Sequence, residues 1–581
     1  RQTELFPDKD LAVGDVNIIP ALSVAYYPTE KGPYNFTTDV DRDGKLRNPE
    51  KRWGGMMRSI TTSDFETANV QYIEIWLMDP FVYDNRHKGG DVYFDLGNVS
   101  EDILKDGRKA FENGLPAGPD IRHVDTTRWG RVPGVQSITN GFDNNSQARR
   151  YQDVGLDGMN DEDERIFYAA YLETLRRTFG ENSKVYREAW NDPAGDNYHF
   201  FRGSDYDALE TPVLERYKQY NGTEGNSPTA DMSPESYPTA ATTLPDVEDI
   251  NGDNTLNETE AFFRYHLELR PEKMKVGENF ITNITTSSVE LPNGSTEEIK
   301  WYQIKIPLSA HESDYGGISD FKSIRFMRML MRGFQDSIVL RMAGLDLVRD
   351  NWRKYEGALD GQLTSSARTV FDISVVNLEE NASRTPVNYV MPPEIERVVD
   401  ASNPQLRELN EQALALKVID LPENDSRAVY KMFGKDLLRY KTLKMDVHAE
   451  AVEGYPLQDD ELTLFLRLGN DNVNNYYEYE IPLKLTSPGY YTSDYTGREG
   501  VWPSANRIEM PLSWFQTLKQ KRNTELRTGD GEIDYSEVYE MLVGTLDPNA
   551  DIDKLNHKVR VKGKPTLGNV KNIVIGIRNP Q

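Results

Sequence analysis

The chain has 581 residues, of which 38% are hydrophobic and 28% charged, and 94 acidic against 67 basic residues give it a net charge of −27. This length allows two to four domains of roughly 100–200 residues each. No run of about 18 apolar residues occurs, which excludes a membrane-spanning helix. The negative net charge argues against nucleic acid as a partner, because phosphate binding needs a positive field. Cysteine is absent, which excludes disulfides and zinc–thiolate sites.

Residues 1–52 are predicted to form an N-terminal segment with a calcium loop. Arg1–Asp10 contains no apolar stretch typical of a signal peptide, so we expect an excised or mature piece of a longer protein. Further on, Asp39–Glu50 (DVDRDGKLRNPE) places oxygen donors at the spacing of a calcium-binding loop, with Gly44 at the sharp turn. The predicted ligands are Asp39, Asp41, Asp43, Lys45 through its carbonyl, and Glu50.

Residues 53–355 are predicted to form a first β-sandwich with a long insertion at residues 99–297. Period-2 alternation of apolar side chains predicts strands at Val70–Leu77, Asp91–Leu96, Trp301–Leu308 and Ser337–Val348. Within the insertion, helical patterns occur at Glu101–Asn113 and Asp161–Thr178, and Asn221–Pro245 has the composition of a mobile loop.

The insertion also contains two further acidic loops with calcium spacing. In Asp249–Glu260 the predicted ligands are Asp249, Asn251, Asp253, Thr255 and Glu260, with Asn254 in place of the turn glycine. In Asp153–Glu164 they are Asp153, Asp157, Met159 through its carbonyl, Asp161 and Glu164. No helical pattern precedes Asp39, so we expect isolated loops that hold Ca²⁺ for structural purposes. A similar stretch at Gly529–Asp534 is more typical of a plain acidic turn.

A connector at residues 356–435 and a second β-sandwich at residues 436–581 complete the predicted organisation. The connector has a strand-like pattern at Thr369–Val376 and a helical one at Gln405–Leu416. In the second sandwich, Leu462–Leu468 is a predicted strand and Pro511–Lys521 a predicted helix.

Three short strings recur in the same order in the two sandwiches. Phe94–Asn98 matches Leu466–Asn470, Trp301–Leu308 matches Tyr476–Leu483, and Asp320–Ile324 matches Asn569–Ile573. We therefore predict a mainly β fold of two related, jelly-roll-like β-sandwich units with helical and calcium-loop insertions. Nothing after Ile573 corresponds to Ser337–Val348, so the second sandwich is expected to lack its last strand and to expose an unpaired edge near Ile573–Ile577.

Sequence motifs of catalysis are absent. The seven histidines form no HExxH, HxH or HxxxH, and no GxSxG, P-loop or GxGxxG occurs. We therefore predict no catalytic residues and no organic cofactor. The pairs Tyr476-Tyr477 and Tyr490-Tyr491 could stack on sugars, although packing in a core or at a sheet edge is the favoured role.

Three strings carry a family resemblance: Lys31–Thr38 (KGPYNFTT), Arg52–Glu74 (RWGGMMRSITTSDFETANVQYIE) and Tyr151–Glu164 (YQDVGLDGMNDEDE). They resemble the SprA/Sov family, the outer-membrane translocon of the type IX secretion system, which is also tied to gliding motility. The resemblance implies a very large single-chain barrel closed by extramembrane parts and partner subunits, through which folded cargo crosses the bacterial outer membrane.

The resemblance implies that this chain is a non-catalytic extramembrane portion of the translocon, on the extracellular side rather than the periplasmic one. It would gate or shield the pore at the cell surface. Its expected partners are the barrel and other parts of its own translocon, associated outer-membrane subunits and transient secreted cargo. The alternative is a calcium-dependent carbohydrate-binding or adhesin module, and a third class, a hydrolase, has no supporting residues.

Overall fold

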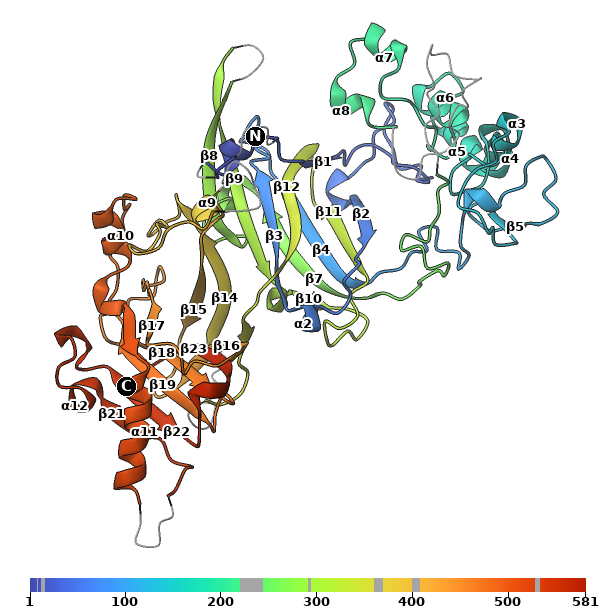
Figure 1. Ribbon diagram of the computed structural model, residues 1–581. Helices are drawn as coiled ribbons and strands as arrows, with labels where there is room; N and C mark the ends of the chain where they lie inside the picture. Colours follow the sequence, from blue (N-terminus) through green and yellow to red (C-terminus); the bar gives the residue numbers. More distant parts are fainter. Residues whose placement is uncertain are drawn as a thin grey trace.

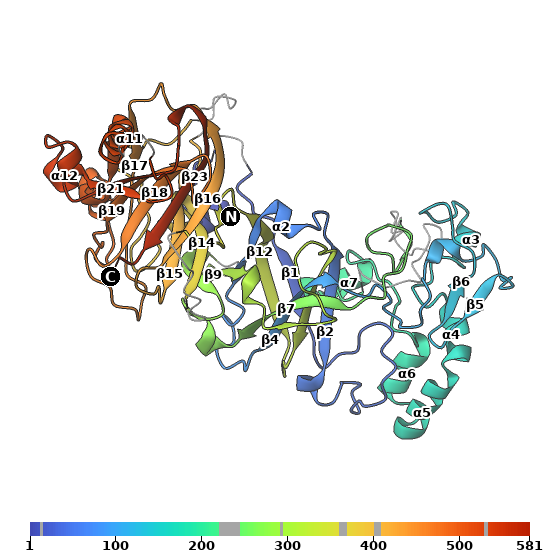
Figure 2. The same cartoon turned by 90° about the horizontal axis from the view of Figure 1, so that it is seen from below.

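The computed structural model describes residues 1–7, 9–11, 16–219, 244–290, 294–359, 369–399, 408–527 and 533–580. The predicted mobile loop Asn221–Pro245 and the acidic turn at Gly529–Asp534 lie largely outside these residues. Three bodies follow one another in Figures 1 and 2. They are a helical unit (residues 99–219), a central β-sandwich and a second β unit that contains the C-terminus. The fold is mainly β with antiparallel sheets, as predicted.

The central β-sandwich consists of two five-stranded sheets. In order across the first sheet lie β1 (Leu22–Tyr26), β12 (Ile338–Arg349), β3 (Val70–Met78), β9 (Thr296–Pro307) and β8 (Ile281–Glu290). The second contains β10 (Ser313–Asp314), β7 (Ala261–Leu269), β4 (Gly90–Asn98), β11 (Phe326–Arg332) and β2 (Trp53–Ser59).

Alternating side chains fill the space between these two sheets. On β4, Val92, Phe94 and Leu96 point into the core, and on β3 Ile73 and Ile75 meet them from the other sheet. This arrangement follows from the period-2 pattern read from the sequence, since successive residues of a strand face opposite sides. The sandwich also includes β1 from before residue 53, and β7 and β8, which fall in the range predicted as an insertion, are strands of it.

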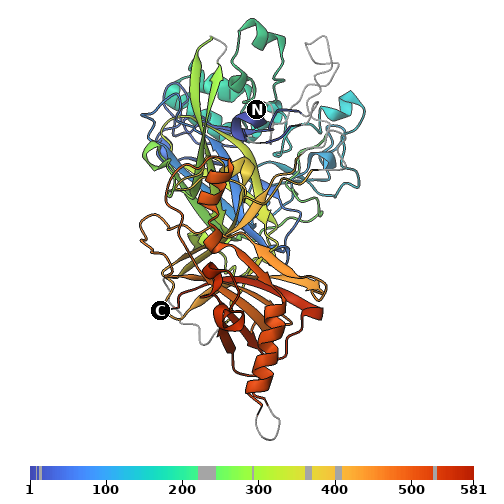
Figure 3. The ribbon, with the colours of Figure 1, turned by 60° about the vertical axis from the view of Figure 1, so that its left-hand side comes forward.

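The second β unit is built on one seven-stranded sheet. Its strands, in order, are β13 (Arg353–Lys354), β16 (Ser426–Lys435), β23 (Val570–Arg578), β18 (Thr463–Gly469), β19 (Tyr476–Pro482), β22 (Lys558–Lys562) and β21 (Tyr539–Leu542). One face packs against helix α11 (Ser513–Glu525), where Tyr477 stacks on Phe515 at 5.0 Å between ring centroids. Figure 3 shows α11 lying beside this sheet.

Three two-stranded ribbons complete the β structure of the described residues. They pair β14 (Val370–Asn377) with β15 (Gln412–Ile419), β17 (Thr442–Met445) with β20 (Ile508–Pro511), and β5 (Val124–Thr126) with β6 (Arg131–Pro133). Ile373 of the first ribbon belongs to the core of the second β unit. This part of the predicted connector therefore packs with the second β unit.

The helices gather mainly in the helical unit, which contains α3 (Ser146–Arg149), α4 (Asp161–Phe167), α5 (Ala169–Phe179), α6 (Lys184–Asn191), α7 (Ser204–Ala208) and α8 (Val213–Arg216). Elsewhere lie α1 (Gln2–Leu5), α2 (Phe65–Ala68), α9 (Leu378–Asn381), α10 (Tyr495–Val501) and α12 (Val543–Leu546). No helix within the described ranges has the length and apolar character needed to cross a bilayer.

Two predicted helices are confirmed and two are wrong. Helix Asp161–Thr178 is present as α4 and α5, and Pro511–Lys521 as α11. Residues 101–113 are instead irregular, ending in a 3-10 turn at Glu112–Gly114, because buried glutamates there accept backbone N–H groups from distant loops. The stretch Gln405–Leu416 was expected to be helical, but from Gln412 it pairs with β14 as strand β15, since its apolar residues also suit an alternating strand.

The expected unpaired edge near Ile573–Ile577 is wrong. Strand β23 lies inside the sheet, where Ile573 pairs with Lys431 of β16 on one side and with Leu468 of β18 on the other. The prediction failed because β16, which covers this edge, comes from the range assigned to the connector.

The internal repeat corresponds to two sheets with the same strand neighbours. In the sandwich the order is β2–β11–β4–β7, and in the second β unit it is β16–β23–β18–β19. Trp301–Leu308 and Tyr476–Leu483 match in sequence but do not occupy equivalent positions, because β9 lies in the other sheet of the sandwich. The strand in the position of β19 is β7, whose Phe262–Leu269 (FFRYHLEL) aligns with Tyr476–Leu483 (YYEYEIPL).

An ion pair with a fully buried carboxylate occupies the same place in both related sheets, with its charges exchanged. Asp95 of β4 pairs with Arg264 of β7 at 2.7 Å, and Arg467 of β18 pairs with Glu478 of β19 at 2.6 Å. Arg560 Nη1 also lies 2.6 Å from Glu478. Burial raises the pKa of Glu478, but the surrounding arginines outweigh it and lower that pKa to about 2.

We predict that Glu478→Gln destabilises the second β unit by about 3 kcal/mol or more, because fully buried Arg467 would lose its countercharge. Urea unfolding of the whole chain measures this loss. The matched control is Glu540→Gln, a partly exposed partner of Arg560, which should cost less than about 1 kcal/mol. Equal losses in the two variants would contradict the prediction.

Candidate metal centre

Five carboxylates converge between helices α4 and α6 of the helical unit. Oxygens of Asp157, Glu164 and Asp196 lie within 4.8 Å of one another, and those of Asp161, Glu164 and Asp192 form a second such group. Asp161 and Glu164 share one face of α4 because three residues make nearly one helical turn.

The chain places these side chains through local caps and turns. Asn160 caps α4, its side chain accepting the N–H groups of Glu162 and Asp163, so that the acidic first turn begins at Asp161. Asp192 follows the last residue of α6, and its Oδ1 accepts the N–H groups of Gly195 and Asp196. The turn after α6 is thereby folded back onto α4.

Hydroxyl and amide groups contact the carboxylates. Tyr168 donates its hydroxyl to Asp157 at 3.2 Å, and Tyr34 donates to Asp196 at 3.1 Å. The backbone N–H of Ala194 donates to Glu164 Oε2 at 2.8 Å. Within the described ranges, no lysine or arginine forms a salt bridge with Asp157 or Glu164.

Burial makes the ionised state of this centre unfavourable without a cation. Asp157 is 1% exposed, and Glu164 and Asp196 are 0% exposed. Burial raises the pKa of Asp157 to about 8 and, together with the charge of Asp157, that of Glu164 to about 9. The pKa values of Asp161, Asp192 and Asp196 are raised as well, chiefly by burial.

The donor set fits a hard divalent cation. All the charged ligands are carboxylate oxygens, which calcium and magnesium prefer. The fully buried Glu164 has one oxygen, Oε1, with no hydrogen-bond partner, although buried polar atoms are almost always paired. A cation at this position would supply the missing partner and neutralise charge.

Gly155 allows the close approach that the centre requires. It has φ +78°, and a Cβ there would stand 2.2 Å from Asp196 Oδ2. No other residue type could occupy this position without moving the carboxylate.

The structure brings together three of the five ligands predicted in the third loop: Asp157, Asp161 and Glu164. Asp153 lies apart and pairs with Arg149 at 2.8 Å. Met159 is buried, and its N–H donates to Asp157 Oδ1.

Sequence reasoning missed Asp192 and Asp196. They stand in Asp192-Pro-Ala-Gly-Asp196-Asn197, an acidic turn directly after a helix. The two acids, with proline and glycine between them, are the signal that could have marked this turn.

The loop Asp39–Glu50 packs on the helical unit through its apolar residues. Val40 and Leu46 belong to one core with Leu172 and Val185 of α5 and α6. Gly44 has φ +86°, as its place at the sharp turn predicts.

The predicted ligands of that loop do not form a close group. Asp39 pairs with Arg52 at 2.8 Å, and Asp41 Oδ1 accepts the N–H groups of Asp43 and Lys45. Glu50 lies in the 3-10 turn Pro49–Lys51. Calcium in this loop stays a prediction.

The loop Asp249–Glu260 is closed by its own hydrogen bonds. Asp249 and Asn251 accept the N–H of Asp253, and Asp253 accepts from Thr255. Asn254 adopts φ +66°, the left-handed conformation predicted for it.

Glu260 turns away from its loop toward the sandwich. It pairs with Arg328 of β11 at 3.2 Å. Calcium in this loop also stays a prediction.

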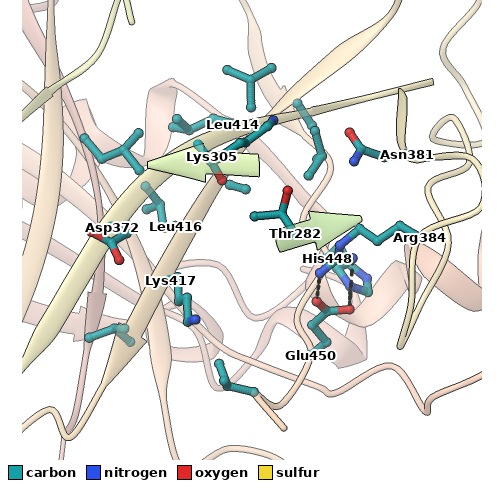
Figure 4. A pocket seen from close by; sticks show the side chains of 18 of the residues that line it. Thr282, Lys305, Asp372, Asn381, Arg384, Leu414, Leu416, Lys417, His448 and Glu450 are labelled. Carbon is teal, nitrogen blue, oxygen red and sulfur yellow. Dashed lines mark hydrogen bonds and ion pairs between the residues drawn. The ribbon is translucent and has the colours of Figure 1, made fainter. Parts of the chain in front are cut away.

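A second feature is a cleft of about 2770 Å³ between the sandwich and the second β unit. Figure 4 shows part of its lining, which includes Leu414 and Leu416 of β15 and Thr282 of β8. Arg384 and His448 both bind Glu450, so these three polar side chains hold one another in place. Their mutual pairing indicates a structural role.

We predict that the calcium-free protein loses stability as the pH rises. The pKa of Asp157 is about 8 in the folded chain against an ordinary 3.8, so folding favours its protonated form. That contribution is full below about pH 4 and is lost as the pH rises toward 8. Thermal unfolding in a chelator, at pH 5 and at pH 8, measures the loss.

The variant Asp157→Asn is the matched control, because asparagine cannot ionise and should flatten part of the pH dependence. A variant with the same pH dependence as the wild type would contradict the assignment.

We also predict that Gly155→Ala destabilises the protein more than Gly107→Ala does. Both glycines have positive φ, which costs alanine about 1–2 kcal/mol, but only at Gly155 would the methyl group overlap a carboxylate. The excess should be about 1–3 kcal/mol in urea unfolding. Equal costs would show that Asp196 can move aside freely.

A family model matches residues 170–581, more than half of the chain, and a search of curated proteins finds no match. The model is SprA_N, described as a motility related/secretion protein. The strings that carried the sequence resemblance lie before residue 170, so the two observations rest on different residues. The chain belongs to the SprA_N family of motility related and secretion proteins.

Proposed function

We propose that the chain is a non-catalytic, extramembrane portion of a protein-export translocon, the type IX system of the bacterial outer membrane. The observation that carries this proposal is the family match, which begins in α5 and covers strands β7–β12 of the sandwich and the whole second β unit. The family is one of motility and secretion proteins and not a class of enzymes, and a secretion role associates the chain with the cell envelope.

In this proposal the chain gates or shields the pore from the extracellular side. It contacts the barrel, associated outer-membrane subunits and secreted cargo in passing. The two β bodies and the helical unit each have a hydrophobic core of their own, which supports a structural role of this kind.

Calcium is part of the proposed function. The acidic loops and the five-carboxylate centre lie in or against irregular stretches of the chain. Because the chain has no cysteine, bound ions can cross-link these stretches where other proteins use disulfides. Calcium would thus act as a structural ion.

The alternative of a carbohydrate-binding module receives less support. Tyr476 and Tyr477, which could have stacked on sugars, are 1% and 3% exposed and pack in the second β unit. Of the pair Tyr490-Tyr491, Tyr490 is exposed, but Tyr491 packs against a core that contains Val387 and Trp502 and is not open for stacking.

We predict that cells whose own copy lacks residues 436–581 fail to export many unrelated cargo proteins. The measurement is the set of secreted proteins in culture medium, with cell-surface adhesion to glycans scored in parallel. Glu478→Gln should reproduce part of the defect through unfolding, and Glu540→Gln should not. Intact export with lost adhesion would favour the carbohydrate-binding alternative and remove the export role.

A further inference from the structure

The carboxylates of the metal centre form two groups and not one. Each group of three has ligand atoms within 4.8 Å of one another, and both contain Glu164. No larger group occurs among the residues that the structure describes. Calcium binds oxygen at about 2.4 Å, so two oxygens on one ion lie at most about 4.8 Å apart. At this distance the five carboxylates divide into two groups, each of a size that one ion can contact.

We propose that this centre binds two calcium ions that share Glu164 as a bridging ligand. The inner ion contacts Asp157, Glu164 and Asp196, and the outer ion contacts Asp161, Glu164 and Asp192. The inference rests on the calcium part of the proposed function and is independent of the export role.

Charge favours two ions over one. The centre holds five carboxylates, and no salt bridge to Asp157 or Glu164 is formed within the described part of the chain. With all five carboxylates ionised, two divalent ions would leave one negative charge, whereas one ion would leave three in a largely buried place. Uncompensated buried charge is strongly unfavourable.

The unpaired oxygen of Glu164 points to the same arrangement. Its Oε2 accepts the N–H of Ala194, while Oε1 is buried without a hydrogen-bond partner. A carboxylate that belongs to both groups has an oxygen available for a second ion. Of the five acids, Glu164 alone is common to both sites.

Two ions would fasten the turn after α6 to α4 at two points. Asp192 and Asp196 come from that turn, and Asp161 and Glu164 from α4. Tyr34 extends the connection to the N-terminal segment, since it donates to Asp196 and accepts the N–H of Leu156.

The test is the number of calcium ions bound per chain, by equilibrium dialysis against calcium alone and native mass spectrometry of the full chain. Differences between variants are compared, because ions in the Asp39 and Asp249 loops would add equally to all. Glu164→Gln should lose two ions, and Asp157→Asn and Asp192→Asn one each. Glu162→Gln, an exposed neighbour on α4, should lose none.

If Glu164→Gln fails to fold by circular dichroism, the double variant of Asp157→Asn and Asp192→Asn replaces it and should lose two ions. A loss of one ion from Glu164→Gln or from the double variant overturns the shared centre while leaving calcium binding intact. No loss in any variant overturns calcium at this centre altogether. Neither result touches the export assay, which is scored on secreted cargo.

Discussion

The helical unit depends on buried carboxylates that accept backbone N–H groups. Glu112 receives those of Val154, Gly155 and Asp246, and Glu101 receives those of Ile250, Asn251 and Asn257. Glu248 joins Leu104 to Ala110 in the same way.

Backbone groups left unpaired in a buried loop are costly, and these three side chains satisfy them where neither helix nor sheet does. These three glutamates hold together the long irregular stretch before α4. Glu112 also fixes Gly155, which lies against Asp196 of the metal centre. Burial raises the pKa of Glu112 well above its ordinary value. In a chain without disulfides, buried acidic side chains therefore hold these loops in place through hydrogen bonds to the backbone.

Sequence patterns identified the strands well because a half-buried strand leaves a period-2 signal in its own residues. They identified α4, α5 and α11 for the same local reason. Partners distant in sequence leave no such signal. Residues 101–113 have helical spacing, but Glu112 finds its partners at Val154 and Asp246, and the tertiary contacts override the local preference.

The metal centre, too, could be predicted from the sequence only where its residues are close along the chain. Asp157, Asp161 and Glu164 lie within one loop and the start of one helix, so their spacing could be read directly. Asp192 and Asp196 reach them only because α5 and α6 form a hairpin. Asp153 fits the ligand spacing but forms an ion pair with Arg149. The spacing alone could not reveal this, because it does not show which side chain has a nearer partner. Likewise, the repeat in the sequence predicted two related sheets. Only the pairing of β7 with β4 in the structure showed that β7 is the strand that corresponds to β19.

The exchanged charges of the two sheets have a consequence for folding. Strands β4 and β18 are similar enough that either could compete for the other's neighbour, and related domains in one chain are prone to such misassembly. If β18 paired with β7, Arg467 would face Arg264; if β4 paired with β19, Asp95 would face Glu478. Each wrong partnership would place two like charges directly opposite one another. The two units can thus share a strand order while electrostatic repulsion keeps each strand from pairing with the other unit's strands during folding.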